Sequence, residues 1–391
     1  MKILIVSPRY YPYTYPATTI SEALFKAGHE VDVLTTVPYK NNEYIEEYNK
    51  LLKEHNGIRV YRMKAVIRKK SALSLIRNYL SFVRKSKRWI RHTSNQYDFV
   101  YTYGVSPVTT LEIGNLYQKK HHVPHIAHVL DVWPESVVAT GYTKRGSLLY
   151  QYLLRKSRNL YQEVDKILIG SLAHKEYIEK LIWPIKKEIG HLPQIATIEE
   201  SKDTTNPFDT KKTNILYCGN ITKLQLLDVM VEAMREYKNK DVILNIVGNG
   251  NYLTSLLEKI EKYKLSNVIY RGYCSPQESY RYLINADAII VSLKNEGFVG
   301  KTVPNKLISS LYFAKPIIGM IENEGREILL NSGGSFVCGE TKEDFIKVLD
   351  TLTNTSSEDK ENMGKKNRQY YDDHFSSDKF VEKLLSSFSS K

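Results

Sequence analysis

Three stretches within the first 36 residues decide the architecture of the N-terminal half. These stretches are KILIVS (2–7), ISEALFKAGHE (20–30) and VDVLTT (31–36). The first and third are short apolar runs typical of buried strands, and the second has the spacing of a helix that ends at a glycine. The order strand, helix, strand predicts a βαβ unit with parallel strands.

The same alternation continues along the chain and restarts after a polar stretch, ESKDTTNPFDTKKT (200–213). Other strand-like runs are DFVYTYG (98–104), HIAHVLDV (125–132), DKILIGS (165–171), NILYCGN (214–220), VILNIVGNG (242–250), AIIVSL (288–293) and KPIIGM (315–320). The sequence therefore predicts an α/β protein of two doubly wound, Rossmann-like domains that face an interdomain cleft. We expect these domains at residues 1–200 and 205–375, with a C-terminal helix over 376–391 that packs back on the first domain.

Charge and composition narrow the class of protein. The 391 residues carry a net charge of +13, and the segment from Arg59 to His92 holds twelve lysines or arginines and no acidic residue. A local basic excess of this kind favours an anionic surface as partner. No apolar run approaches the roughly 18 residues of a membrane-spanning helix, and the N-terminus lacks the features of a signal peptide, so we expect a cytoplasmic protein.

Residues 68–92 have the pattern of an amphipathic helix, with apolar residues that include Trp89 along one broad side. The basic residues on the opposite side are Arg77, Arg84, Arg88 and Arg91. This pattern is typical of a helix that lies at a lipid interface, so we predict that the segment docks the protein on an anionic membrane. The alternative is an ordinary surface helix, packed on the first domain, with a solvated basic face.

Two loops that follow strands in the second half carry groups suited to a sugar nucleotide. In CGNITKLQ (218–225), Gly219 lets the backbone approach a ligand, and Lys223 and the amides of the next helix suit a phosphate. In LKNEGFVGKTVPNK (293–306), Glu296 suits sugar hydroxyls and Lys306 suits a diphosphate. The alternative for each group is a plain turn with solvated charges.

A third loop, HVLDVWPESV (128–137), follows a strand of the first domain. Acids at the carboxyl end of such a strand point into the interdomain cleft of this architecture. We therefore predict Asp131 as a catalytic residue, with Glu135, one helical turn further on, as a second candidate. The alternative for Asp131 is a helix cap or a turn residue.

Several motifs, taken in order, carry a resemblance to a known family. They are KILIVSPRYYP (2–12), DVWPES (131–136), GNITKLQ (219–225), VGNG (247–250) and VPNKLISSLYFAKPII (303–318). Over almost its full length the chain resembles the retaining glycosyltransferases of family four, which have the GT-B fold. DVWPES and the PNK…KPII segment are similar to the branch of bacterial N-acetylfucosamine transferases of capsule and O-antigen assembly.

The resemblance implies an activity and a set of partners. A sugar would pass, with its anomeric configuration kept, from a nucleotide diphosphate donor, UDP-linked in this branch, to a polyprenyl-diphosphate-linked saccharide at the inner face of a membrane. The expected donor-binding residues are Gly219, Asn220, Lys223, Gly248, Glu296, Lys306 and Ser309. Ser309 stands where the family usually has an acidic residue, so either Ser309 or Glu296 would hold the ribose. The family needs no metal and no cofactor, because basic groups and helix ends stabilise the departing diphosphate.

Other classes of protein remain open from the sequence. A UDP-sugar 2-epimerase shares the scaffold and a similar donor site but does not need a basic amphipathic segment. A nucleic-acid-binding protein would place basic residues among aromatic stacking platforms on an open surface. The helical spacing and wide apolar face seen here fit a lipid surface better, so we expect no nucleic acid partner. A family member that has lost activity is a further alternative.

Overall fold

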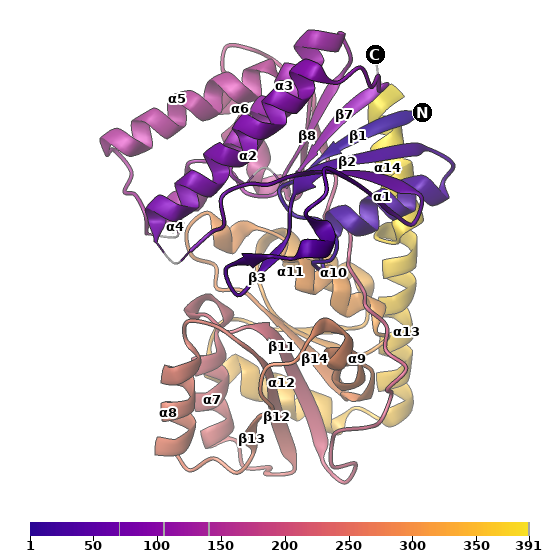
Figure 1. Ribbon diagram of the computed structural model, residues 1–391. Coiled ribbons are helices and arrows are strands. Elements are labelled where there is room, and N and C mark those ends of the chain that lie inside the picture. The colour runs from indigo at the N-terminus through magenta and orange to yellow at the C-terminus, as the bar shows by residue number, and fades with distance from the viewer. Residues whose placement is uncertain (70, 105, 140, 390–391) are drawn as a thin grey trace. The chain divides into compact units, whose positions relative to one another are not determined.

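The computed structural model describes residues 1–69, 71–104, 106–139 and 141–389 (Figure 1). The chain forms two compact units, and each is described by itself. Unit 1 consists of Met1–Ile195 with Ser377–Lys391, and unit 2 consists of Ala196–Ser376. Both are α/β units with parallel sheets covered on both faces by helices, which confirms the predicted fold class. Lys70 of the predicted basic segment and residues 390–391 of the predicted C-terminal helix lie outside the described residues.

The main sheet of unit 1 has the strand order β10-β9-β8-β7-β1-β2-β6-β5, and the described neighbours are parallel apart from β5 with β6. Its strands are β1 (Lys2–Val6), β2 (Glu30–Thr36), β5 (Leu52–His55), β6 (Ile58–Met63), β7 (Phe99–Tyr103), β8 (His125–Val129), β9 (Lys166–Ile169) and β10 (Ile189–His191). A small hairpin joins β3 (Tyr39–Lys40) to β4 (Glu43–Tyr44). The first βαβ unit is present as predicted, because β1 pairs in parallel with β2.

The helices of unit 1 cover both faces of this sheet (Figure 1). They are α1 (Pro16–Lys26), α2 (Ala72–His92), α3 (Leu111–His121), α4 (Glu135–Ala139), α5 (Leu148–Glu163), α6 (Lys175–Ile182) and α14 (Ser377–Ser389), with 3-10 turns η1 (Glu46–Tyr48), η2 (Val108–Thr110) and η3 (Leu172–His174). Side chains alternate along β1, so Ile3 and Ile5 pack with α1 and α14, whereas Leu4 and Val6 pack with α2 and α3. This alternation divides the apolar core of unit 1 into two layers.

Unit 2 has a parallel sheet with the strand order β13-β12-β11-β14-β15-β16. Its strands are β11 (Thr213–Asn220), β12 (Val242–Asn249), β13 (Val268–Tyr270), β14 (Ala288–Ser292), β15 (Ile317–Met320) and β16 (Ser335–Val337). Its helices are α7 (Leu227–Glu236), α8 (Leu253–Lys262), α9 (Pro276–Asn285), α10 (Asn305–Tyr312), α11 (Asn323–Ser332), α12 (Lys342–Asn354) and α13 (Ser357–His374), with 3-10 turns η4 (Lys223–Gln225) and η5 (Val299–Lys301). The predicted donor residues are spread over several elements of this unit: Gly219 and Asn220 end β11, Lys223 begins η4, Gly248 lies in β12, Glu296 follows β14, and Lys306 and Ser309 lie in α10.

The ends of β11 and β12 are pressed together at two glycines. Gly219 pairs in register with Gly248, and a Cβ atom at Gly248 would overlap the carbonyl oxygen of Gly219. Gly219 itself has a φ of 144°, which favours glycine. These glycines let the ends of the two strands pack closely at the carboxyl edge of the sheet, the edge where ligands of doubly wound sheets bind.

Candidate functional site

The most unusual charge in unit 2 is the ammonium of Lys306, in the first turn of α10. Its Nζ atom is buried and has no hydrogen-bond partner among the described residues. It lies 3.7 Å from the centroid of the Tyr217 ring, whose face attracts a cation. Burial lowers the pKa of Lys306 to about 7. Burial of an unpaired charge is unfavourable in free energy, so a bound anion would stabilise the charged form of this lysine.

Gly219 and Tyr217 create the space that Lys306 occupies. A Cβ atom at position 219 would lie 2.8 Å from the Lys306 Nζ atom, so only glycine leaves room for the ammonium there. The Tyr217 hydroxyl donates to the carbonyl oxygen of Asn220, which fixes the ring beneath the lysine. The sequence predicted Gly219 and Lys306 as residues of the site but did not indicate Tyr217, because a tyrosine within an apolar strand is ordinarily a core residue.

A cavity of about 250 Å³ in unit 2 brings together three predicted donor residues, Gly219, Lys306 and Ser309. The residues that line it are Thr197, Ile198, Glu199, Cys218, Gly219, Pro276, Ser279, Tyr280, Leu283, Ile289, Lys306, Ser309, Ser310 and Phe313. The Ser309 hydroxyl donates to the carbonyl oxygen of Lys306 at 3.1 Å. Its oxygen still has capacity to accept a hydrogen bond from a ligand hydroxyl.

The other predicted donor residues do not line this cavity. Glu296 is exposed and pairs with Lys294 at 2.6 Å, and this pairing lowers the pKa of the Glu296 carboxyl. The Lys223 ammonium lies 5.9 Å from the ring centroid of Tyr252. The carbonyl oxygen of Asn220 accepts the Tyr217 hydroxyl, and that of Gly248 accepts the Tyr270 hydroxyl at 2.9 Å. Donor binding by these four residues therefore stays a prediction.

In unit 1, Asp131 follows β8 at the carboxyl edge of the sheet, as predicted. The side chain of Asp131 is exposed, yet the protein around it reduces the hydration of the carboxyl group and so raises its pKa. A hydrogen bond from the Ser106 side chain opposes that rise. The Trp133 indole donates to the same Ser106 hydroxyl at 3.3 Å. Four tyrosines lie near Asp131, and burial raises the pKa of each. The negative charge of Asp131 adds to that rise in Tyr15, Tyr79, Tyr103 and Tyr161. This aromatic surround was not recognised from the sequence.

Glu135 has a different environment from Asp131. It is buried, and its Oε2 atom accepts from Arg145 Nε at 3.0 Å and Nη2 at 2.7 Å. Its Oε1 atom accepts from the Tyr150 hydroxyl at 2.9 Å. Because both oxygens have protein partners, the structure favours a positioning role for Glu135, and its catalytic role stays a prediction.

The structure corrects the predicted apolar face of the basic helix. In α2, Phe82, Val83 and Ile90 are buried in the core of unit 1, and the Trp89 ring packs on Tyr61 with centroids 4.6 Å apart. Trp89 is thus engaged with the protein, because the sheet needs an apolar helix face to cover it. The exposed apolar residues of α2 are confined to its first turns: Leu73, Ile76 and Leu80. Arg77, Arg84, Arg88 and Arg91 are exposed.

Metal ligands and membrane spans were also sought in the described part of the chain. No group of three or more His, Cys, Asp or Glu side chains there is arranged to hold a metal ion. His125 and His128 are buried singly in β8, and burial lowers their pKa values to about 3 and about 4. Among the same residues, no helix combines the length and the apolar character needed to cross a bilayer.

Comparison with known proteins agrees with this arrangement. Residues 17–188 match Glycosyltransferase Family 4, and residues 198–370 match Glycosyl transferases group 1. WbjE, a probable glycosyltransferase of Pseudomonas aeruginosa, is 25% identical over 211 residues, and the match covers 51% of this chain and 51% of that relative. The match thus spans about half the length of this relative.

Solved structures share the fold over the whole chain. Sucrose-phosphate synthase (tll1590) from Thermosynechococcus elongatus has a TM-score of 0.70 at 14% identity, over 99% of this chain and 98% of that chain. Alr3699/HepE of Anabaena, crystallised with UDP and glucose, has a TM-score of 0.66 at 12% identity, over 100% of both chains. The fold and the family matches together define a glycosyltransferase enzyme. The chain belongs to the GT-B glycosyltransferases of the family-four type, because the two matched segments jointly cover most of its length.

Proposed function

We propose that this enzyme transfers a sugar, with retention of configuration, from a UDP-linked donor to a lipid-linked saccharide during cell-surface polysaccharide biosynthesis. The observation that carries the proposal is the buried, unpaired ammonium of Lys306 beneath Gly219. A structurally similar protein was crystallised with UDP and glucose, which supports a nucleotide sugar here. The branch of the family that the sequence resembles favours an N-acetylated deoxyhexosamine as the sugar.

In this proposal Lys306 binds the diphosphate of the donor. Charge develops on that diphosphate as the bond to the sugar breaks, and a preorganised cation in a poorly solvated site stabilises it strongly. The main-chain amides after β11 add donors at the same sheet edge. The Ser309 hydroxyl accepts from the ribose. With these groups in place, the reaction needs neither a metal nor a cofactor.

Asp131 serves the acceptor side of the reaction. Its exposed carboxylate either orients the acceptor hydroxyl or stabilises positive charge that develops on the sugar. Its raised pKa indicates an environment of reduced solvation, in which such electrostatic effects are stronger than in water. The acceptor is a polyprenyl-diphosphate-linked saccharide, and the enzyme meets it as a peripheral protein on the inner face of an anionic membrane.

Calorimetry with UDP tests the central residue. Lys306→Ala should weaken UDP binding at least tenfold at pH 7, because a charge-assisted contact contributes roughly 1.5–3 kcal/mol. Lys262→Ala, which removes an exposed lysine of α8, is the matched control and should bind UDP as the wild type does. Unchanged UDP affinity in a folded Lys306→Ala protein would remove this lysine from the site.

A further inference from the structure

A second acid-free basic segment lies beside the one already described. Between Glu135 and Glu163 the chain has no acidic residue, and it has five basic ones: Lys144, Arg145, Arg155, Lys156 and Arg158. Four large apolar or aromatic side chains in the same segment are exposed: Tyr142 (53%), Leu148 (91%), Leu149 (49%) and Tyr152 (59%). We call residues 141–152 the α5 knuckle. Such a cluster of exposed apolar side chains on one short segment marks an interaction site.

The α5 knuckle is held in place by specific contacts. Arg145 and Tyr150, on either side of the two leucines, both bind the buried carboxylate of Glu135. The Ser147 side chain caps α5 by accepting from the Tyr150 amide at 3.1 Å, and its hydroxyl is bonded to Thr143 Oγ1 at 2.8 Å. The leucines are therefore presented outward by a fixed turn. Glu135 acts as a positioning residue for this turn.

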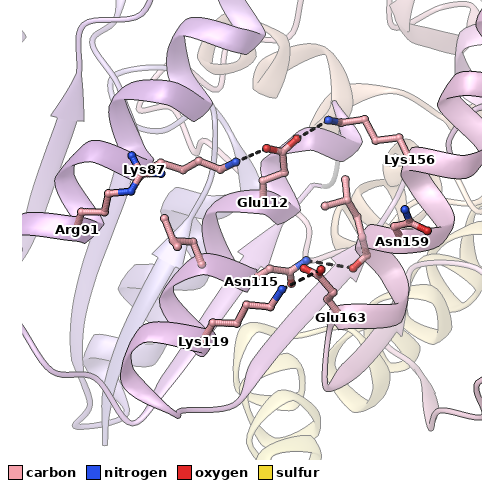
Figure 2. Close-up of a pocket in the computed structure, with 10 residues that line it drawn as sticks. Lys87, Arg91, Glu112, Asn115, Lys119, Lys156, Asn159 and Glu163 are labelled. Atoms are coloured by element: carbon pink, nitrogen blue, oxygen red, sulfur yellow. Dashed lines mark hydrogen bonds and ion pairs between the residues drawn. The ribbon is translucent and has the colours of Figure 1, made fainter.

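An ion triad fixes α5 relative to α2. Glu112, on α3, pairs with Lys87 of α2 on one side and with Lys156 of α5 on the other, the latter at 2.8 Å (Figure 2). Arg91 of α2 and Glu163 of α5 line the same pocket, further toward the C-terminal ends of their helices. The two helices thus run in the same direction on either side of α3.

This arrangement places the third turn of α2 level with the first turn of α5. Leu80 precedes Lys87 by seven residues, and Leu149 precedes Lys156 by seven residues. At 1.5 Å per residue, both leucines lie about 10 Å from the ion triad toward the helix N-termini. A cavity of about 640 Å³ lined by Tyr142 of the knuckle together with Leu75, Arg68 and Lys69 also joins the two regions.

We propose that the α5 knuckle inserts its leucines and tyrosines into the headgroup region of an anionic bilayer, beside the first turns of α2. The docking surface comprises Leu73, Ile76, Leu80, Tyr142, Leu148, Leu149 and Tyr152. Leucine suits the acyl boundary and tyrosine suits the headgroup level. Lys144 and Arg155 are exposed and have no ion pair among the described residues, so they attract anionic lipid, whereas Arg145 and Lys156 are paired with Glu135 and Glu112. This combination favours a bilayer over a second copy of the chain, which would have to bury the basic residues against one another.

The docking surface lies on the side of unit 1 that the acceptor must reach. Helices that follow parallel strands begin at the carboxyl edge of the sheet, and Asp131 lies at that edge. Tyr79 directly precedes Leu80 on α2. Burial raises the pKa of Tyr79, and the nearby charge of Asp131 adds to that rise, whereas Arg68 and Arg9 oppose it. This part of the inference rests on the proposed function, because a lipid-linked acceptor would then approach Asp131 while its lipid stays in the bilayer.

Flotation with vesicles tests the inference. The full-length protein should float with vesicles of phosphatidylcholine and phosphatidylglycerol, and much less with phosphatidylcholine alone. The double variant Leu148→Ser/Leu149→Ser should float at least tenfold less, whereas Leu330→Ser, which alters an exposed leucine of α11, should float as the wild type does. Retention of UDP binding would show that the donor site in unit 2 is intact, and an unchanged circular dichroism spectrum would show that unit 1 of the double variant is folded.

Two results would overturn the inference. Equal flotation of the wild type and the double variant would exclude the α5 knuckle as a lipid contact. A wild type that does not float, and forms a dimer in sedimentation that the double variant lacks, would assign the surface to a second copy of the chain. Failure of the proposed function is a separate outcome, because a Lys306→Ala protein that binds UDP normally would leave the flotation result unchanged.

Discussion

The two units use cations in opposite ways. Unit 1 exposes Arg77, Arg84, Arg88 and Arg91 along one helix, whereas unit 2 buries the single ammonium of Lys306 against an aromatic ring. Exposed charges act by number and at a distance, and salt screens them within about 10 Å at 0.1 M. A buried charge acts singly, is screened much less and responds to pH. The comparison indicates that burial, more than the number of basic residues, distinguishes a site that binds one anionic ligand from a surface that attracts anions at a distance.

The largest effect is expected on the exposed cations. Changing Arg77, Arg84, Arg88 and Arg91 to Glu should weaken binding to anionic vesicles by about a thousandfold, because each basic residue near such a surface contributes about 1 kcal/mol. UDP affinity should not change. Flotation and calorimetry on the same preparation measure both, with Lys238→Glu/Lys262→Glu as a control for charge reversal on the surface of unit 2. A loss of UDP binding in the arginine variant would contradict the separation of the two roles.

A second contrast sets Asp131 against Glu135. Asp131→Asn should lower turnover about a hundredfold, the usual scale for loss of a positioned electrostatic or acid–base group. Glu135→Gln should lower turnover less than tenfold on a water-soluble acceptor analogue, because the carboxylate of Glu135 is occupied by Arg145 and Tyr150. Initial rates of sugar transfer under saturating donor measure both. The reverse order of effects would make Glu135 the catalytic residue and Asp131 structural.

The smallest expected effect is that of pH on UDP affinity. The pKa of Lys306 is about 7 in the free protein, and a bound diphosphate should raise it, so binding above pH 7 takes up a proton. UDP affinity should therefore fall about tenfold between pH 7 and pH 8.5. Lys306→Arg should flatten this dependence, because guanidinium stays charged. Calorimetry at several pH values decides the matter, and a flat wild-type profile would indicate that Lys306 is not the group that titrates.

Much of the fold follows from local patterns in the sequence. Alternating strand and helix signals predicted both Rossmann-like units, and strand-end position located Gly219, Lys306 and Asp131 correctly at sheet edges. What those patterns do not contain is the partner of each side chain. Periodicity identified the apolar side of α2 but not the sheet that covers Phe82 and Ile90. Likewise, the residues next to Glu135 in the sequence do not indicate that Arg145 and Tyr150 bind its carboxylate. The exposure of the adjacent leucines Leu148 and Leu149 also leaves no periodic pattern in the sequence.

The return of the chain from unit 2 into unit 1 has a consequence for synthesis. Phe380, Val381 and Leu384 of α14 complete the same apolar layer as Ile20 and Leu24 of α1, so unit 1 lacks part of its core until α14 has left the ribosome. Unit 2, by contrast, is continuous from Ala196 to Ser376 and is complete earlier. Unit 1, although most of it is made first, therefore remains incomplete and open to chaperones until α14 emerges.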